Sequence, residues 1–259
     1  MKMIKALSLS VLVLGLAIIG SVVPARAQAT AHFTAPSGWV PKSIAYIKSS
    51  NATHDYQFGS AISVSGDGNT LAVGSIGESS GAKGANGNQG DHSVSDSGAV
   101  YIFTRRNGAW AQQAYIKPSN PKEGADFGNA VALSNDGNTL AVGAYVEDSS
   151  ATGINGNQMD HSMDGAAAVY LFTRSGTTWS QQAYVKASNP GEGDQFGFSV
   201  ALSGDGNSLA VGAIEEASKA TGINGDQADD SVAGTGAVYV YTRMETKWSQ
   251  QAYVKPDGP

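Results

Sequence analysis

The residues best suited to chemistry lie in one loop that the sequence repeats three times at a spacing of 69 residues. Carboxylate, amide and hydroxyl side chains alternate there with glycine. Hard oxygen donors on a tightly bent backbone are the ligands that calcium uses in proteins. Calcium is therefore the candidate cofactor, and its candidate ligands are Glu78, Asn86, Asn88, Asp91, Glu147, Asn155, Asn157, Asp160, Glu216, Asn224, Asp226 and Asp229.

A second interpretation of the same loop needs no metal. Asn, Asp and Ser side chains also fold loops by bonding to nearby backbone groups. No single span of the loop matches a complete calcium-loop pattern. Both interpretations stay open at the level of sequence.

Catalytic residues are not indicated by the sequence. His92 and His161 share a column of the repeat, but the third copy has Asp230 there. A catalytic base has no reason to be copied into two units and dropped from a third. No Gly-x-Ser-x-Gly motif with triad partners is present either. We expect a protein that is not an enzyme.

The loop belongs to a unit that reads as four short strands. The phrase at 112–117 returns at 181–186 and 250–255 without any insertion between copies. In the middle copy, alternating or apolar runs separated by turns predict strands at 127–134, 139–144, 166–173 and 179–186. Asp136-Gly137 is typical of the tight hairpin between the first two.

Four antiparallel strands repeated in series predict an all-β fold, a β-propeller-type array. We expect three complete blades at about 57–118, 126–187 and 195–256, preceded by an extra N-terminal outer strand at Trp39–Lys48. Propellers typically close with four or more blades, so this is a partial propeller. A parallel β-helix is the competing fold, but its rungs are shorter and lack Asp-Gly hairpins.

Two motifs carry a resemblance to a known family. Phe127-Gly128 followed by Leu140-Ala-Val-Gly143-Ala144 resembles an FG-GAP repeat, and both motifs recur in the other two copies. The resemblance covers residues from about 38 to 255 and is nearest to a bacterial secreted subgroup. It implies the propeller blades of integrin α-chain heads. The chain departs from the integrin calcium loop, because Asp67, Asp136 and Asp205 each stand alone in their turns.

Two aromatic columns are expected to form the repeat's structural core. They are Phe58, Phe127 and Phe196, and Trp110, Trp179 and Trp248. Large aromatic side chains dominate core packing. The alternative for the tryptophans is stacking on sugars, as in propeller lectins.

The N-terminus predicts export. Residues 1–27 combine a positive start, an apolar stretch and a small-x-small site at Ala25–Ala27, typical of a signal peptide cleaved before Gln28. A linker at 28–37 and the array at 38–259 follow. We expect a secreted, periplasmic or cell-surface protein, with no membrane span after cleavage.

Charge and cysteine content narrow the partners. Cleavage removes Lys2, Lys5 and Arg26 and no acid, so the net charge falls from −6 to −9. A negative chain disfavours nucleic acid as a partner. The absence of cysteine excludes disulfides.

The sequence thus predicts a non-enzymatic binding, adhesion or structural module with an unidentified protein or glycan ligand. The alternatives are a sugar-binding propeller lectin and a truncated fragment of a larger secreted enzyme or surface assembly. Self-association that covers the open faces of the end blades is also expected, because repeat arrays normally need polar caps.

Overall fold

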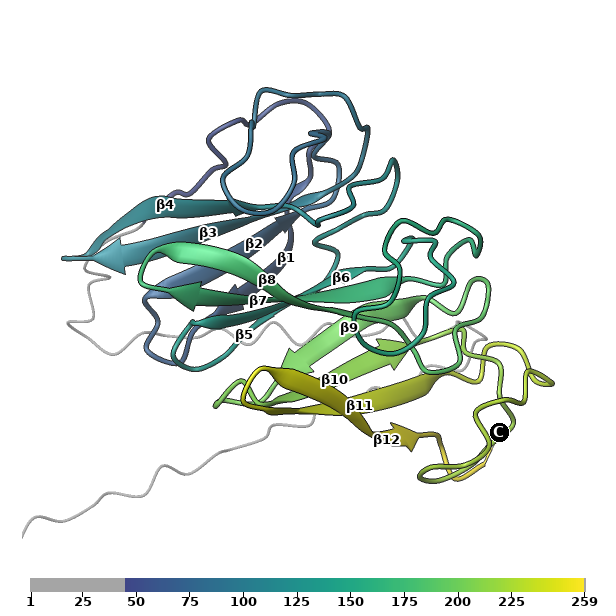
Figure 1. The fold of residues 1–259 in the computed structure, drawn as a ribbon. Helices are drawn as coiled ribbons and strands as arrows, with labels where there is room; N and C mark the ends of the chain where they lie inside the picture. Colours follow the sequence, from purple (N-terminus) through teal and green to yellow (C-terminus); the bar gives the residue numbers. More distant parts are fainter. Residues whose placement is uncertain (1–44, 259) are drawn as a thin grey trace, which may run out of the picture. The chain divides into compact units, whose positions relative to one another are not determined.

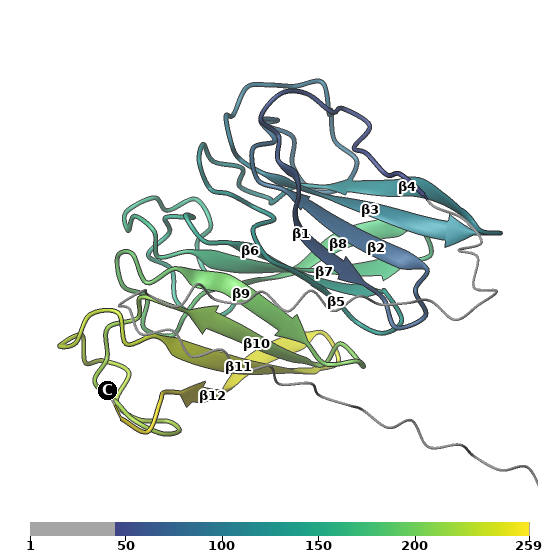
Figure 2. The same cartoon turned by 180° about the vertical axis from the view of Figure 1, so that it is seen from behind.

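The computed structural model describes residues 45–258 as an all-β protein, which confirms the predicted fold class. Three antiparallel sheets of four strands each follow one another along the chain (Figures 1 and 2). The expected signal peptide, the linker and the first part of the expected strand at Trp39–Lys48 lie outside the described residues. Within those residues, no helix is long and apolar enough to cross a membrane.

Each sheet is one blade, and its strands pair in chain order. Blade 1 consists of β1 (Phe58–Val64), β2 (Thr70–Ser75), β3 (Ala99–Arg106) and β4 (Ala109–Ile116). Blade 2 consists of β5 (Val131–Leu133), β6 (Thr139–Ala144), β7 (Ala168–Ser175) and β8 (Thr178–Val185). Blade 3 consists of β9 (Phe196–Leu202), β10 (Ser208–Ala213), β11 (Ala237–Met244) and β12 (Lys247–Val254).

The turn between the first two strands of each blade is held by its aspartate. In blade 1, Asp67 Oδ1 accepts hydrogen bonds from the Ser65 hydroxyl at 2.6 Å and from the Asn69 backbone N–H at 2.9 Å. The hydrogen bond from Ser65 is the main reason why the pKa of Asp67 falls to about 2. Gly68 has a φ of 69°, which glycine adopts without strain. These single carboxylates therefore serve as turn residues.

Every blade has two unlike faces because side chains alternate along its strands. One face, here called the aliphatic face, presents small and branched side chains, which in blade 2 include Ala141, Val169 and Leu171. The opposite face, here called the aromatic face, includes Tyr170 and Phe172 in the same blade.

The core lies between blades, where the aliphatic face of one meets the aromatic face of the next. Val100 and Ile102 of blade 1 share a buried cluster with Tyr170 and Phe172 of blade 2. A second cluster joins the aliphatic face of blade 2 to the aromatic face of blade 3. One interface is thus used twice, in the same orientation along the chain.

Glycine in the second strand lets consecutive blades approach closely. A Cβ atom on Gly74 would lie 2.1 Å from the carbonyl oxygen of Gly128, and one on Gly143 would lie 2.2 Å from that of Gly197. Such distances leave no room for any side chain. The Leu-Ala-Val-Gly motif therefore ends in glycine because the Phe-Gly of the following blade rests on it.

A polar clamp also joins consecutive blades. Gln113 Oε1 of blade 1 accepts hydrogen bonds from Arg174 Nη1 and from Trp179 Nε1 of blade 2, both at 3.1 Å. Arg174 Nη2 reaches the Thr70 hydroxyl of blade 1 at 3.2 Å. Arg243 and Trp248 of blade 3 repeat this clamp against Gln182 and Thr139 of blade 2.

The N-terminal segment differs from expectation where it is described. Residues 45–48 are not part of any strand. Ile47 nevertheless packs on the aromatic face of blade 1, and the Ser50 backbone N–H donates to Gln112 Oε1 at 3.2 Å. The Ser119 N–H makes the equivalent bond to Gln181 in blade 2. The segment lies against blade 1 without ladder bonds because the described residues contain no preceding sheet for it to join.

Candidate functional site

The three glutamates of the loop lie in the interior of the blades, each paired with a lysine. Lys117 Nζ donates to Glu78 Oε2 at 2.8 Å, and both side chains are fully buried. The corresponding distances are 2.9 Å for Lys186 and Glu147, and 2.6 Å for Lys255 and Glu216. The glutamate follows the second strand of its blade, and the lysine directly follows the fourth, so the pair ties the long loop to the end of the outer strand.

Three further groups donate hydrogen bonds to the carboxylate in blades 2 and 3. In blade 2, Tyr184 Oη donates to Glu147 Oε1 at 2.8 Å, and the Ser149 backbone N–H donates to Oε2 at 3.2 Å. Asn120 Nδ2 donates to Oε1 at 3.3 Å, and its Oδ1 accepts from Tyr170 Oη at 2.7 Å. These donors and the lysine ammonium group replace the hydrogen bonds that the buried carboxylate would otherwise make to water.

The asparagine of each cluster comes from the chain segment that enters the blade. Asn51, Asn120 and Asn189 precede blades 1, 2 and 3, and each donates to the glutamate of the blade that follows it. We call the Glu, Lys, Asn and two Tyr that meet at this place in a blade its charge cluster. The charge cluster therefore joins a blade to the linker before it.

Burial shifts the pKa of several lysines and tyrosines in the charge clusters. Loss of hydration lowers the pKa of Lys117 and of Lys186, and the facing glutamate opposes part of that effect. Burial likewise raises the pKa of Tyr170 well above its usual value. In blade 1, the buried Tyr115 hydroxyl has no hydrogen-bond partner among the described residues.

The other candidate calcium ligands shape the loop itself. Asn86, Asn155 and Asn224 adopt a φ of 58°, and each accepts a hydrogen bond from the backbone N–H of a tyrosine in the fourth strand. Asn88, Asn157 and Asp226 each accept from the N–H two residues later. Asp91 and Asp229 do the same, and Asp160 accepts from the Ser150 N–H and the Ser162 hydroxyl.

The structure separates the glutamates from the rest of the candidate calcium set. Glu78, Glu147 and Glu216 face lysine, whereas the asparagines and aspartates bond to the loop backbone. Across residues 45–258, no group of three or more His, Cys, Asp or Glu side chains is placed to hold a metal ion. Calcium binding stays a prediction, and its candidate donors are now the amide and aspartate columns.

If the loop binds calcium, the melting temperature of the protein should rise with the concentration of free calcium. Binding to the folded state alone stabilises a protein by mass action. We expect a higher melting temperature in millimolar calcium than in chelator, and a smaller difference for Asp160→Asn. Magnesium at the same ionic strength controls for the general screening of the loop's negative charges by salt. Identical melting curves in calcium and in chelator would show that the loop binds no calcium and that its Asn, Asp and Ser side chains only fold the loop backbone.

The sequence did not single out the partners of the glutamates. The lysines are the last residues of the repeated phrase at 112–117, 181–186 and 250–255, and the asparagines precede each unit. The signal in the sequence is a lysine that recurs in all three copies at the end of an apolar strand, because a lysine in such a place needs a buried acidic partner. Its acidic counterpart has an equally strict spacing, 39 residues before the lysine.

The tryptophans of blades 2 and 3 lie between blades. Trp179 and Trp248 are buried, and the guanidinium of Arg174 or Arg243 lies 5.3 Å from the indole ring. These two side chains are covered and cannot stack on a sugar. Trp110 of blade 1 is half-buried and contacts Arg105 at 5.5 Å. Phe127 and Phe196 are fully buried, whereas Phe58 is half-buried.

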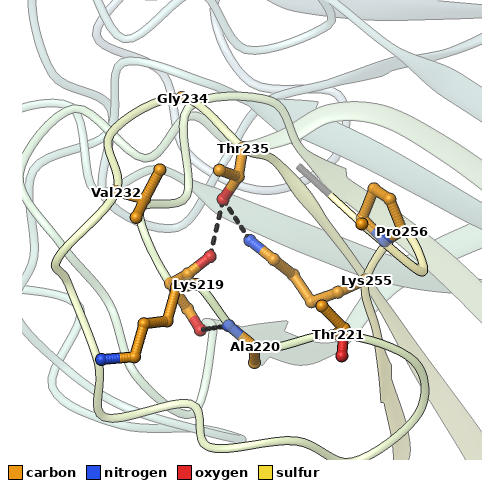
Figure 3. A pocket seen from close by; sticks show the side chains of 10 residues that line it. Lys219, Ala220, Thr221, Val232, Gly234, Thr235, Lys255 and Pro256 are labelled. Carbon is orange, nitrogen blue, oxygen red and sulfur yellow. Dashed lines mark hydrogen bonds between the residues drawn. The ribbon is translucent and has the colours of Figure 1, made fainter.

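A cavity of about 360 Å³ lies beside the charge cluster of blade 3 (Figure 3). It is lined by Val232, Thr235, Lys255 and Pro256, and Thr235 Oγ1 accepts from Lys255 Nζ. In blades 1 and 2 the next linker crosses the equivalent place: the Gly124 N–H donates to the Ser95 carbonyl at 3.0 Å. The cavity is therefore the position that a following linker would occupy.

Sheets of this form, packed face to face in series, define a β-propeller-like array. Residues 110–172 and 179–241 match the family model described as FG-GAP repeat. Each match starts on the fourth strand of one blade and ends in the third strand of the next. These two matches confirm the resemblance to FG-GAP repeats that the sequence indicates.

Solved structures with a similar arrangement are much longer than this chain. Hydrazine synthase from Kuenenia stuttgartiensis matches at 14% identity with a TM-score of 0.40, over 83% of this chain and 41% of that one. A hypothetical selenium-binding protein from Sulfolobus tokodaii matches at 10% identity with a TM-score of 0.37, over 73% and 39%. The chain thus spans about two fifths of these structures. No curated protein matches.

Proposed function

We propose that the chain is an exported, non-enzymatic binding or adhesion module in which FG-GAP blades form the scaffold. One observation carries this proposal. The glutamate and the lysine that recur in all three blades are turned inward and paired with each other, so their role is to hold loops and linkers in place. Groups used in this way support a rigid display surface better than they support a reaction.

Export is tested by location and mass. The protein is expressed with its own N-terminus in a bacterial host, and the cells are fractionated. We expect the chain in the periplasm, in the medium or on the cell surface. Its mass should equal that of a chain that starts at Gln28. Protein that stays in the cytoplasm and still contains Met1–Ala27 would contradict export. A membrane-bound form of full mass would show that the segment is an anchor.

Sugar binding is the second candidate, and it now depends on one residue. Trp110 is the half-buried member of its column, and Arg105 leaves part of the ring in contact with solvent. A glycan array with the wild type, Trp110→Ala and the loop variant Met159→Ala as control tests it. Glycan signal lost in Trp110→Ala but kept in the control would favour a lectin. Equal signal in all three would favour a different ligand class.

A further inference from the structure

The two end blades present opposite halves of the interface that joins blades inside the chain. The aliphatic face of blade 3 has no following blade in the described residues. Val238 is 40% exposed there, although its counterparts Val100 and Val169 are fully buried. Gly212 shows the same vacancy, because no backbone from a following blade lies near it, in contrast to Gly74 and Gly143.

The aromatic face of blade 1 is the complementary half. Val64 is 54% exposed, while Leu133, its counterpart in blade 2, is 9% exposed. Ile62 on the same strand is 68% exposed, and its counterpart Val131 packs on the core between blades. Among the described residues, 45–56 cover only part of this face, and Ile62 and Val64 of β1 stay exposed.

The two halves of the polar clamp are also divided between the end blades: blade 3 holds the acceptors and blade 1 holds the donors. Gln251 and Ser208 of blade 3 are the counterparts of Gln182 and Thr139, which accept from Arg243 and Trp248. Gln251 is exposed. Blade 1 holds the donors, Arg105 and Trp110. Among the described residues, the only side-chain hydrogen bond of Arg105 goes to Asn69 of its own blade.

We propose that the aromatic face of blade 1 in a second copy of this chain docks on the aliphatic face of blade 3, head to tail. Arg105 and Trp110 of the incoming copy then donate to Gln251, and Phe58-Gly59 rests on Gly212. A second copy is the occupant because this chain carries both halves, and the same two faces already fit each other twice within it. The inference does not depend on the proposed export or on any ligand.

Docking requires one segment of the incoming copy to move. Ala45–Lys48 repeats the sequence Ala-Tyr-Ile/Val-Lys found at Ala252–Lys255. By the register of the repeat, both segments would occupy the same place at the new interface. Ala252–Lys255 makes ladder bonds with β11, whereas Ala45–Lys48 makes none. The incoming segment is therefore the one that is displaced.

A head-to-tail contact leaves one free face at each end of an open assembly, so further copies add until a ring closes or a long chain of copies forms. Sedimentation velocity and light scattering of the purified chain measure this. We expect the average mass to rise with protein concentration above that of one chain. Val64→Glu and Val238→Glu each place a charge on one half, and each should return the chain to a monomer.

Mixing the two variants distinguishes head-to-tail docking from the alternatives. Val64→Glu keeps an intact blade 3 face, and Val238→Glu keeps an intact blade 1 face. Their equimolar mixture should therefore form a dimer and nothing larger. Met159→Glu, on an exposed loop, should associate like the wild type. Circular dichroism checks that every variant is folded.

Other outcomes would overturn the proposal. A wild type that stays monomeric at all concentrations excludes docking. Loss of association in Val238→Glu alone, with Val64→Glu unaffected, would indicate a symmetric contact between two blade 3 faces. If either glutamate variant fails to fold, Ile62→Glu and Gln251→Arg replace them, since both positions are exposed. The arginine at 251 would face Arg105 of the incoming copy and should also give a monomer.

Discussion

Replacing Lys186 by methionine is expected to lower the free energy of unfolding by about 3–5 kcal/mol, because it leaves Glu147 buried without its counter-charge. Lys186 and Glu147 are almost completely inaccessible to solvent. In this blade Ala166 stands where Ser97 or Thr235 gives the other lysines a second partner, so the ion pair is the main contact of Lys186. Urea unfolding followed by tryptophan fluorescence measures the change.

Two further variants interpret the result. Lys219→Met removes an exposed lysine that pairs with Asp229, and we expect a change below about 1 kcal/mol. The double variant Glu147→Gln with Lys186→Met removes both charges and should be more stable than Lys186→Met alone. A loss no greater in Lys186→Met than in Lys219→Met would show that the pair is not buried in solution.

Replacing Phe127 by alanine is expected to cost about 3–5 kcal/mol, the usual range for a buried phenylalanine. The ring lies in the core between blades 1 and 2, 5.4 Å from the ring of Tyr170 and 6.1 Å from that of Phe172, both edge-on. Blade 1 supplies the opposite wall. Removal therefore opens a cavity that strands on both sides cannot fill by small shifts.

Phe58→Ala is the matched comparison. Phe58 makes the same edge-on contacts with Tyr101 and Phe103 but is only half-buried, because no blade covers it in the described residues. Its loss should be clearly smaller, when measured at protein concentrations too low for association. Equal losses at both positions would mean that Phe58 is covered in solution as Phe127 is.

The sequence was sufficient to predict the fold because each blade depends on local patterns. Three features of the sequence reflect contacts within one unit or between equivalent units. They are the alternation at Val131 and Leu133, the Asp136-Gly137 turn and the strict spacing of the copies. The last four residues of the strand expected at Trp39–Lys48 are not a strand, for the opposite reason. A strand needs a neighbouring edge, and the sequence of the segment does not reveal whether one is present.

The charge cluster was harder to predict because its members lie far apart in the chain. Glu147 and Lys186 are 39 residues apart, and Asn120 comes from the linker before the blade. Acidic side chains in a polar loop suggest a cation. The three glutamates face the ammonium group of a lysine, whereas calcium at the other candidate ligands stays a prediction. Only the fold shows that the loop bends back over the end of β8 to bring them together.

The position of the linker asparagine before each blade suggests an order in which the blades fold. Asn120, Glu147, Tyr170, Tyr184 and Lys186 emerge from the ribosome in that order, so a blade can complete its polar interior as soon as its own last strand has been made. Nothing from the next unit is needed for this step. The newly finished blade then presents a bare aliphatic face on which the next one can assemble. We therefore expect the array to assemble one unit at a time from the N-terminus onward, because each linker asparagine belongs to the blade that follows it.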